Sequence, residues 1–219
     1  MQARAAGAFT RYDPFKRLLD VVLATTGLVV VGPLLLAAAL AVKLTSPGPI
    51  LFRQQRAGRQ GRCFCLLKLR TMRAGRTPDP QEIVPLDHPD VTRIGRLLRR
   101  TKIDELPQLF NVLAGDMAIV GPRPTLPEQV ENYDAEQRRR LVVRPGCTGL
   151  AQVNGNTALS WPERIQWDLY YVDHYSLGMD LAILLKTVVV IVLGPDRFAR
   201  RIDQSALGGT RAHERHTNR

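Results

Sequence analysis

The stretch Val21–Val42, VVLATTGLVVVGPLLLAAALAV, contains 22 residues and no charged side chain. As one straight helix it would reach about 33 Å, which is enough to cross the hydrocarbon core of a bilayer. It lacks a small-x-small cleavage site ahead of a polar mature start, so a cleavable signal peptide does not fit. The stretch therefore predicts a helix inserted in a membrane, and the rest of the fold must be arranged around it.

Two membrane arrangements fit this helix, a spanning anchor and a re-entrant helix. Gly32 and Pro33 lie at its middle, where proline removes a backbone donor and clashes with the carbonyl group of Val29. We therefore expect the helix to break at this pair. A spanning helix carries positive charge mainly on one side, but here both flanks are basic. The basic residues are Arg11, Lys16 and Arg17 before the stretch and Lys43, Arg53 and Arg56 after it. This symmetry favours re-entry, with both ends on the same side of the membrane.

The composition limits the class of protein. The 219 residues correspond to about one domain, and 45% of them are hydrophobic, too many for a disordered tail and too few for a multi-span transporter. Lys and Arg number 31 against 20 Asp and Glu, so the partner is anionic: nucleic acid, a phosphorylated substrate or an anionic leaflet. Cys63, Cys65 and Cys147 are odd in number and lack zinc-site spacing, which favours free thiols in a reducing, cytosol-facing location.

A basic β-hairpin is predicted after the membrane stretch. Two strand-like runs, Ile50–Gln55 and Cys63–Met72, are separated by a glycine-containing loop. Residues 51–76 include eight basic side chains and no acidic one. Because side chains alternate along a strand, Lys68 and Arg70 lie on the same face. That face either presents two cations to an anion or is a solvated strand face.

Two further segments fit either a membrane surface or the protein core. Over Val91–Arg100, helical spacing places Ile94, Leu97 and Leu98 on one face and arginines on the other. Leu181–Leu193 is too short to span a bilayer, and it carries one long cationic stem, Lys186. The Pro- and Asp-rich residues 77–89 predict an exposed loop. The Arg-rich residues 194–219 predict a mobile tail.

The chemistry is expected at Asp104 and Glu105. Pro107 is favourable only in the first turn of a helix, so a helix should begin close to Asp104. Both carboxylates would then lie at the positive end of the helix dipole and stay ionised. One would suit a covalent nucleophile and the other a ligand for a hard cation such as Mg²⁺. Acidic residues placed there for helix stability alone are the competing interpretation.

Two rigid loops present arginines. Arg123 stands between Pro122 and Pro124, which restricts its backbone and suits fixed presentation of a guanidinium group to phosphate. Arg144 begins a second loop of the same kind, Arg-Pro-Gly followed by a glycine turn. Such loops can surround an anion with backbone donors and one arginine.

Taken together and in this order, these motifs resemble the bacterial sugar transferase family, the monotopic polyprenyl-phosphate phosphoglycosyl transferases. The resemblance extends from about Phe15 to Leu193. The matching motifs are Lys16–Asp20, Ser46–Pro49, Phe52–Gln54, Lys68–Met72, Arg99–Glu105, Gly115–Met117, Gly121–Pro124, Arg144–Gly146, Gly149–Gly155 and Tyr170–Val172. The family often breaks its membrane helix at Ser-Pro, whereas this chain has Gly32-Pro33.

The resemblance implies a fold and a reaction. The fold is α+β, a small mixed α/β catalytic domain with a Pro-broken re-entrant membrane helix and amphipathic interfacial helices. The implied division is residues 1–44 for the membrane segment, 45–193 for the catalytic domain and 194–219 for the tail. The implied reaction transfers a sugar-1-phosphate from a UDP-sugar to undecaprenyl phosphate and releases UMP, the first membrane step of glycan assembly.

The resemblance also implies roles for single residues. Asp104 would attack the β-phosphorus and form a phosphosugar-aspartyl intermediate, and Glu105 would hold Mg²⁺. The phosphate-binding cations would be Lys68, Arg70, Arg99, Arg123 and Arg144. The enzyme would lie at the cytoplasmic face of the bacterial inner membrane, on an anionic leaflet. The resemblance leaves open which sugar is transferred and whether the enzyme forms a homo-oligomer.

Two other classes remain as alternatives. A non-catalytic basic scaffold on the membrane, or a nucleic-acid-binding protein, would explain the charge but not the carboxylate pair among rigid arginine loops. Aromatic residues make up only 6%, and no stacking motif for nucleic acid is present, so no nucleic-acid partner is expected. A lipid-diphosphate phosphatase would also use Asp and Mg²⁺, but it would release phosphate without a UDP-sugar.

Overall fold

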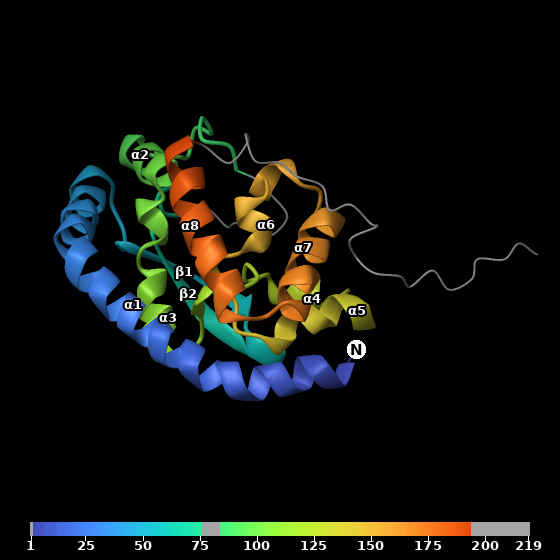
Figure 1. The fold of residues 1–219 in the computed structure, drawn as a ribbon. Coiled ribbons are helices and arrows are strands. Elements are labelled where there is room, and N and C mark those ends of the chain that lie inside the picture. The colour runs from blue at the N-terminus through green and yellow to red at the C-terminus, as the bar shows by residue number, and fades with distance from the viewer. Residues whose placement is uncertain (1, 76–83, 194–219) are drawn as a thin grey trace, which may run out of the picture.

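A computed structural model describes residues 2–75 and 84–193 of the chain (Figure 1). Helices and short strands are mixed along the chain, so the expected α+β class is confirmed. The tail from 194 to 219, and most of the loop expected at 77–89, lie outside the described residues. The division into three parts stays a prediction.

Helix α1, Gln2–Thr45, is a single long element that contains Pro14 and Pro33. At Gly32-Pro33, where the sequence predicts a bend and a break, the helix remains one element, and it curves around one side of the molecule (Figure 1). A proline inside a helix removes one hydrogen bond and bends the axis. Packing on the domain at both ends of α1 accounts for the helix continuing past that defect.

The contacts of α1 lie along one stripe. Ala24 is buried against a core that includes Phe64 and Val112. Further along, Ala38 and Val42 are buried in a second cluster with Leu69 and Leu98. Tyr12–Thr45 is nevertheless the part of the described chain that is long and apolar enough to cross a membrane.

The hairpin is confirmed with small shifts at its ends. Strand β1, Leu51–Ala57, pairs antiparallel with β2, Cys63–Leu69, through the short turn η1, Arg59–Gly61. Phe52 lies opposite Lys68 in this register. Since β2 ends at Leu69, Arg70 lies just beyond the strand.

The next segment holds the carboxylates. Helix α2, Arg93–Thr101, is capped by the Thr92 side chain, which accepts a hydrogen bond from the Gly95 amide group. Asp104 and Glu105 then lie in a single 3-10 turn, η2, Ile103–Glu105, and α3 begins later, at Gln108–Ala114. The expected helix start near Asp104 is thus corrected. The left-handed backbone of Lys102, at φ 60°, ends α2 and turns the chain so that a separate turn forms.

A second, parallel pair of short strands lies beside the hairpin. These strands are β3, Ala118–Val120, and β4, Gly146–Thr148. Between them run α4, Pro127–Glu131, α5, Ala135–Arg138, and η3, Arg139–Val142. After them come α6, Leu150–Val153, η4, Asn156–Ala158, α7, Trp161–Asp173, and α8, Leu177–Leu193.

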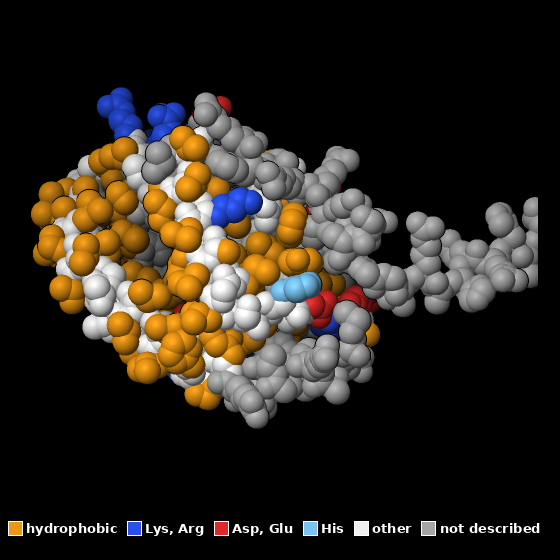
Figure 2. Space-filling model, viewed as in Figure 1, with side chains coloured by type: hydrophobic (Ala, Val, Ile, Leu, Met, Phe, Trp, Pro, Cys, Tyr) orange, Lys and Arg blue, Asp and Glu red, His pale blue; other side chains and the backbone are white. Residues whose placement is uncertain are grey.

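Helix α8 has a side buried in the protein core and a side of exposed apolar residues, so it has features of both interpretations that the sequence left open. Ile183 is buried in a core with Tyr171 and Val120, whereas Leu185 is 72% exposed. In the view of Figure 2, hydrophobic side chains gather over α1 and α8. Lys186 donates a hydrogen bond to the Oδ1 atom of Asn154, so its side chain reaches the C-terminal end of α6.

Candidate active site

Asp104 is a buried carboxylate with an unsatisfied oxygen. It is only 7% exposed, and its Oδ1 atom has no hydrogen-bond partner among the residues that the structure describes. Burial, followed by the charge of Glu105, raises the pKa of this carboxyl group, while Lys68, Lys102 and Arg99 act in the opposite direction. A carboxylate oxygen without a protein hydrogen-bond partner is a candidate nucleophile, because no protein contact has to be broken before it reacts.

Glu105 is held by two cations. Its Oε1 atom lies 2.8 Å from the Nζ atom of Lys68 and 2.8 Å from the Nη2 atom of Arg123. Burial works to raise the pKa of Glu105, but Arg123 and Lys68 outweigh it and hold this pKa well below its usual range. Glu105 is therefore ionised in the fold, as expected, and it organises Lys68 and Arg123 around the reactive turn.

These three groups come from distant parts of the chain. Lys68 is near the end of β2, Glu105 ends the η2 turn, and Arg123 follows β3. The expected grouping of Lys68 and Arg123 with the carboxylate pair is thus observed as geometry. Their binding of a substrate stays a prediction.

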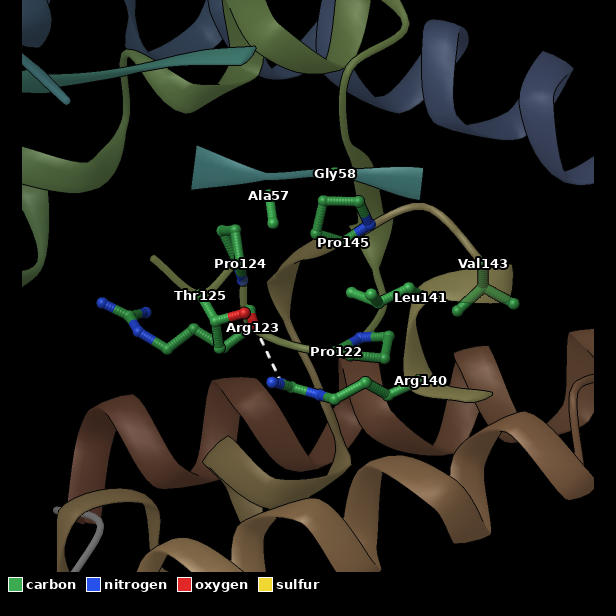
Figure 3. A pocket seen from close by; sticks show the side chains of 10 residues that line it. All are labelled: Ala57, Gly58, Pro122, Arg123, Pro124, Thr125, Arg140, Leu141, Val143 and Pro145. Carbon is green, nitrogen blue, oxygen red and sulfur yellow. Dashed lines mark hydrogen bonds between the residues drawn. The ribbon is translucent and has the colours of Figure 1, made fainter. Parts of the chain in front are cut away.

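The loop that carries Arg123 is fixed from behind. Arg140 donates a hydrogen bond of 3.0 Å from its Nη2 atom to the carbonyl oxygen of Arg123, and it forms a buried ion pair with Asp168. Figure 3 shows the Arg123 side chain extending away from Leu141 and Val143, which line a small cavity beneath the loop.

A glycine is required where this loop begins. A Cβ atom on Gly121 would lie 2.4 Å from the carbonyl oxygen of Arg144, which no side chain can accommodate.

Arg70 and Arg144 make hydrogen bonds to carbonyl groups away from the carboxylate pair, and their binding of phosphate stays a prediction. The Nη2 atom of Arg70 donates hydrogen bonds to the carbonyl oxygen and the hydroxyl group of Ser46, at 2.8 and 2.9 Å, and its Nη1 atom donates to the Pro47 carbonyl oxygen. The Nε atom of Arg144 donates to the Gly115 carbonyl oxygen at 3.1 Å. Both guanidinium groups bind carbonyl oxygens just after the C-terminal end of a helix, α1 for Arg70 and α3 for Arg144. Carbonyl groups there lack partners within the helix and attract cations.

Arg99 occupies an intermediate position. Its Nε atom donates to the Thr71 hydroxyl group at 2.9 Å, and its Nη1 atom donates to the Val84 carbonyl oxygen at 3.2 Å. Its charge nevertheless acts on Asp104 and lowers the pKa of that carboxyl group. Arg99 thus belongs to the electrostatic surroundings of Asp104.

Sequence reasoning missed the role of Arg17, which it treated only as a basic flank. Its Nη1 and Nη2 atoms donate to the carbonyl oxygens of Val112 and Leu113, at 2.6 and 2.9 Å, at the end of α3. Arg17 therefore links the membrane helix to the helix that follows Asp104 and Glu105. The sequence signal for this contact was the basic pair Lys16-Arg17 next to a long apolar run.

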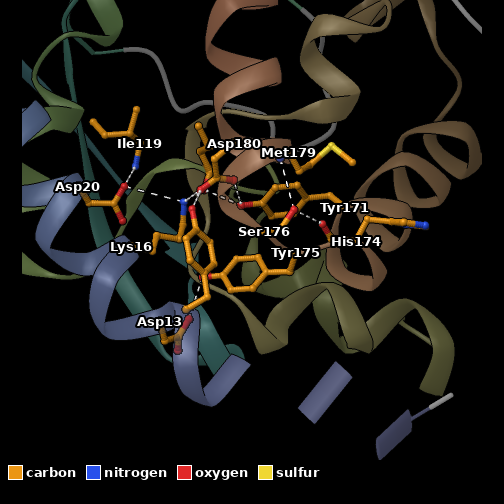
Figure 4. A network of polar contacts seen from close by, with 12 residues as sticks. Asp13, Lys16, Asp20, Ile119, Tyr171, His174, Tyr175, Ser176, Met179 and Asp180 are labelled. Carbon is orange, nitrogen blue, oxygen red and sulfur yellow. Dashed lines mark hydrogen bonds and ion pairs between the residues drawn. The ribbon is translucent and has the colours of Figure 1, made fainter. Parts of the chain in front are cut away.

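A buried polar network makes a second link. Lys16 forms an ion pair with Asp180 of α8, and Asp180 also accepts a hydrogen bond of 2.7 Å from the Tyr171 hydroxyl group (Figure 4). Asp20 accepts a hydrogen bond of 2.9 Å from the Ile119 amide group in β3. Charged side chains in an apolar helix are costly unless they are paired, so this network specifies where α1 packs.

The carboxylates fit a magnesium ion that is shared with a substrate. In residues 2–75 and 84–193, no group of three or more His, Cys, Asp or Glu side chains is placed to hold a metal alone. Mg²⁺ is often bound by one or two carboxylates together with phosphate oxygens and water. The unsatisfied Oδ1 atom of Asp104 and the Oε2 atom of Glu105, whose contact with Arg123 is a long 3.4 Å, match that requirement.

Comparison with known proteins gives a family match over most of the chain. The profile of the family described as "Bacterial sugar transferase" matches residues 11–194. A UDP-glucose:undecaprenyl-phosphate glucose-1-phosphate transferase of Caulobacter vibrioides is 49% identical over 186 residues, which cover 80% of this chain and 69% of that protein. The uncharacterized sugar transferase EpsL of Bacillus subtilis is 43% identical over 79% of this chain and 85% of its own length.

A more distant relative acts on a different sugar. It is a UDP-N-acetylgalactosamine-undecaprenyl-phosphate N-acetylgalactosaminephosphotransferase of Aeromonas hydrophila, 38% identical over 84% of this chain and 45% of its own length.

Proposed function

The chain belongs to the bacterial sugar transferase family and is a transferase, and from this premise we propose that it moves a sugar-1-phosphate from a UDP-sugar to undecaprenyl phosphate, with release of UMP. The proposal rests on the arrangement of two adjacent carboxylates. Asp104 has a buried oxygen without a hydrogen-bond partner, and Glu105 is held by Lys68 and Arg123. The relatives differ in their named sugar, so the sugar is left open.

The proposed chemistry has two displacements at phosphorus. A carboxylate oxygen of Asp104 attacks the β-phosphorus, a new P–O bond forms, and the bond to the bridging oxygen breaks with its electron pair leaving on UMP. An oxygen of undecaprenyl phosphate then attacks the same phosphorus, and the acyl-phosphate bond breaks to restore the Asp104 carboxylate. Each step forms one P–O bond and breaks one.

Lys68 and Arg123 are the proposed phosphate-binding cations. Phosphoryl transfer depends mainly on positioning and on charge stabilisation, and both cations are held beside the nucleophile before substrate arrives. Glu105 aligns them through its two ion pairs, and Arg140 fixes the backbone that carries Arg123.

Glu105, with Asp104 beside it, is the proposed holder of Mg²⁺. When bound, the ion would neutralise the diphosphate and the departing UMP. Because replacing Glu105 also breaks two ion pairs, chelation of the unaltered enzyme is the cleaner test, and it is expected to stop UMP release. Full turnover after exhaustive chelation would exclude the magnesium proposal.

We further propose a monotopic location on the cytoplasmic face of the inner membrane. Lys16 and Val42 are 26 residues apart, or about 39 Å along a straight helix, yet both are buried against the same domain. A helix crossing the bilayer would carry one of these ends away from that domain. The basic side chains around the site also suit an anionic leaflet.

The reaction is tested by measuring UMP released by purified enzyme in detergent with Mg²⁺, undecaprenyl phosphate and a panel of UDP-sugars. We expect UMP release with at least one UDP-sugar and loss of at least about 10³-fold of the rate in Asp104→Asn. Phosphate release without a UDP-sugar would instead support a lipid-diphosphate phosphatase. An inactive protein that still binds the membrane would support a scaffold.

A further inference from the structure

Arg56, near the end of β1, is a half-buried cation with a buried, unpaired Nε atom. Its Nη2 atom donates a hydrogen bond of 2.6 Å to Gln54, while its Nη1 atom reaches the Pro124 carbonyl oxygen only at 3.4 Å. Its Nε atom is buried and has no hydrogen-bond partner in the described part of the chain. A buried donor left unpaired costs free energy until a ligand or water satisfies it.

The charges around Arg56 are unbalanced. Burial, followed by the positive charge of Arg123, lowers the pKa of Arg56 to about 10, against the weaker opposite effects of Glu105 and Glu128. Arg164 shows the same two effects, burial and repulsion by Arg123, and its pKa is also lowered. Glu105 is already shared between Lys68 and Arg123, so it compensates the positive charge of Arg56 only in part.

A purely structural role does not explain this arrangement. The contact of Arg56 with Pro124 would tie β1 to the Pro-Arg-Pro loop, but the next residue already does so. The Ala57 amide group donates a hydrogen bond of 2.9 Å to the Thr125 carbonyl oxygen. The contact at 3.4 Å adds little to that link.

The groups beside Arg56 are partly accessible to a ligand. The side chain of Arg123 is 39% exposed, and those of Lys68 and Glu105 are each 18% exposed. The Nη1 atom of Arg56 reaches the carbonyl oxygen of Pro124, the residue after Arg123, so Arg56 lies beside the loop that carries Arg123.

We propose that Arg56 and Arg123 form a subsite for the phosphate that leaves with the nucleotide. The inference rests on the proposed function, in which the attacked phosphorus must lie at Asp104. The neighbouring phosphate of a nucleoside diphosphate would then occupy the place where the unpaired Nε–H group and the surplus positive charge are found. Bidentate guanidinium groups suit this task better than ammonium groups.

The test uses the full-length enzyme in detergent and UMP as the probe. Titration calorimetry is expected to show that Arg56→Gln weakens UMP binding by about tenfold or more, since a hydrogen bond to a charged group is lost. The KM for the UDP-sugar should rise by a similar factor, while the dependence on undecaprenyl phosphate stays unchanged. Arg53→Gln is the matched control, because it removes the same charge from an exposed position of the same strand.

The outcomes separate this inference from the proposed function. UMP affinity within twofold of the unaltered enzyme in Arg56→Gln, with turnover intact, overturns the subsite alone. An equal loss in Arg53→Gln overturns it too, because the effect would be general attraction by net charge. If the unaltered enzyme neither binds UMP nor releases it, the proposed function fails.

A conservative variant covers the case in which Arg56→Gln does not fold. Arg56→Lys keeps the charge but removes the Nε–H group and the planar fork. We expect it to bind UMP about three- to tenfold more weakly than the unaltered enzyme. Unchanged UMP affinity in this variant overturns the proposal.

Discussion

Asp104 and Glu105 are adjacent in the chain, but the fold moves the pKa values of their carboxyl groups in opposite directions. Asp104 is buried next to the negative Glu105, which makes ionisation unfavourable. Glu105 is also buried, but Arg123 and Lys68 stabilise its charge. Two identical functional groups thereby acquire different electrostatic environments, which fits the different roles proposed for them.

Asp104→Asn should abolish turnover and make the protein more stable at neutral pH. A raised carboxyl pKa means that the folded state binds the proton more tightly, so stability is lost as the pH rises through that pKa. At pH 7 we expect the melting temperature of the variant to be about 1–3 °C higher. The difference should vanish below the pKa of an ordinary Asp, and a lower melting temperature at pH 7 would contradict the argument.

The same residue should hold the covalent intermediate. Incubation of the enzyme with UDP-sugar alone is expected to leave a phosphosugar on the peptide that contains Asp104, as detected by mass spectrometry. Asp104→Asn, in which an amide replaces the attacking carboxylate, is the control that should show no adduct. An adduct on another peptide would relocate the nucleophile.

Glu105→Gln should destabilise the protein in a pH-dependent way. A depressed carboxyl pKa contributes stability above the unfolded value of about 4.5, and that contribution is lost as the pH falls through the folded pKa. At pH 7 the variant should be less stable by about 2 kcal/mol, because Lys68 and Arg123 lose their partner in a largely buried site. Melting curves without Mg²⁺ should converge with those of the unaltered enzyme in acid. A constant difference would exclude this ion pairing.

Helix α1 is the element that places the site relative to a membrane. Through Arg17 it holds the end of α3, and through Lys16 it holds α8. Its opposite side exposes large apolar residues such as Val29 and Leu36, each 73% exposed. One face of the helix therefore binds the protein, and the other suits lipid.

Pro33→Leu should shift α1 toward a straight, spanning helix, because it restores the missing backbone donor at the bend. The probe is a cysteine at Ala3 in a chain without its native cysteines, treated with a membrane-impermeant thiol reagent on intact spheroplasts. The parent chain should stay unlabelled until lysis. Pro33→Leu should show labelling and reduced activity, and Leu36→Ala serves as the control.

Labelling of the parent chain on intact spheroplasts would show that its N-terminus lies outside. In that case α1 spans the membrane, and the monotopic proposal is wrong.

In the molecule as a whole, α8 and α1 combine into an apolar surface (Figure 2). The exposed apolar side chains of α8 include Leu185, Val188 and Ile191, which are 72%, 62% and 60% exposed. An exposed patch of this extent in a protein with an apolar anchor suits the interfacial region of a bilayer.

The double variant Leu185→Glu with Ile191→Glu should weaken binding to lipid vesicles by about tenfold or more, since two large apolar side chains leave the interface. Vesicle flotation with anionic lipids measures this, and the melting temperature should not change. Gln55→Glu with Gln60→Glu adds the same charge at exposed positions of the hairpin as a control. Unchanged flotation together with loss of an oligomer would reassign this face of α8 to contact between copies of the chain.

Several elements follow from short-range patterns in the sequence. The uncharged run predicted α1, alternation predicted the hairpin, and amphipathic spacing predicted α2. Pro107 predicted a helix near Asp104, but α3 begins only at Gln108. These features depend on hydrogen bonds and side-chain periods within a few residues. Close neighbours along the chain therefore specify them.

Which cations meet the carboxylates depends on the packing of distant segments. Lys68 and Arg123 reach Glu105, whereas Arg70 and Arg144 hold backbone carbonyl groups. All four looked equivalent in the sequence, as basic residues in rigid or extended segments. Their difference arises because the partner of a long side chain is set by how segments tens of residues apart pack together, and no local pattern encodes that packing.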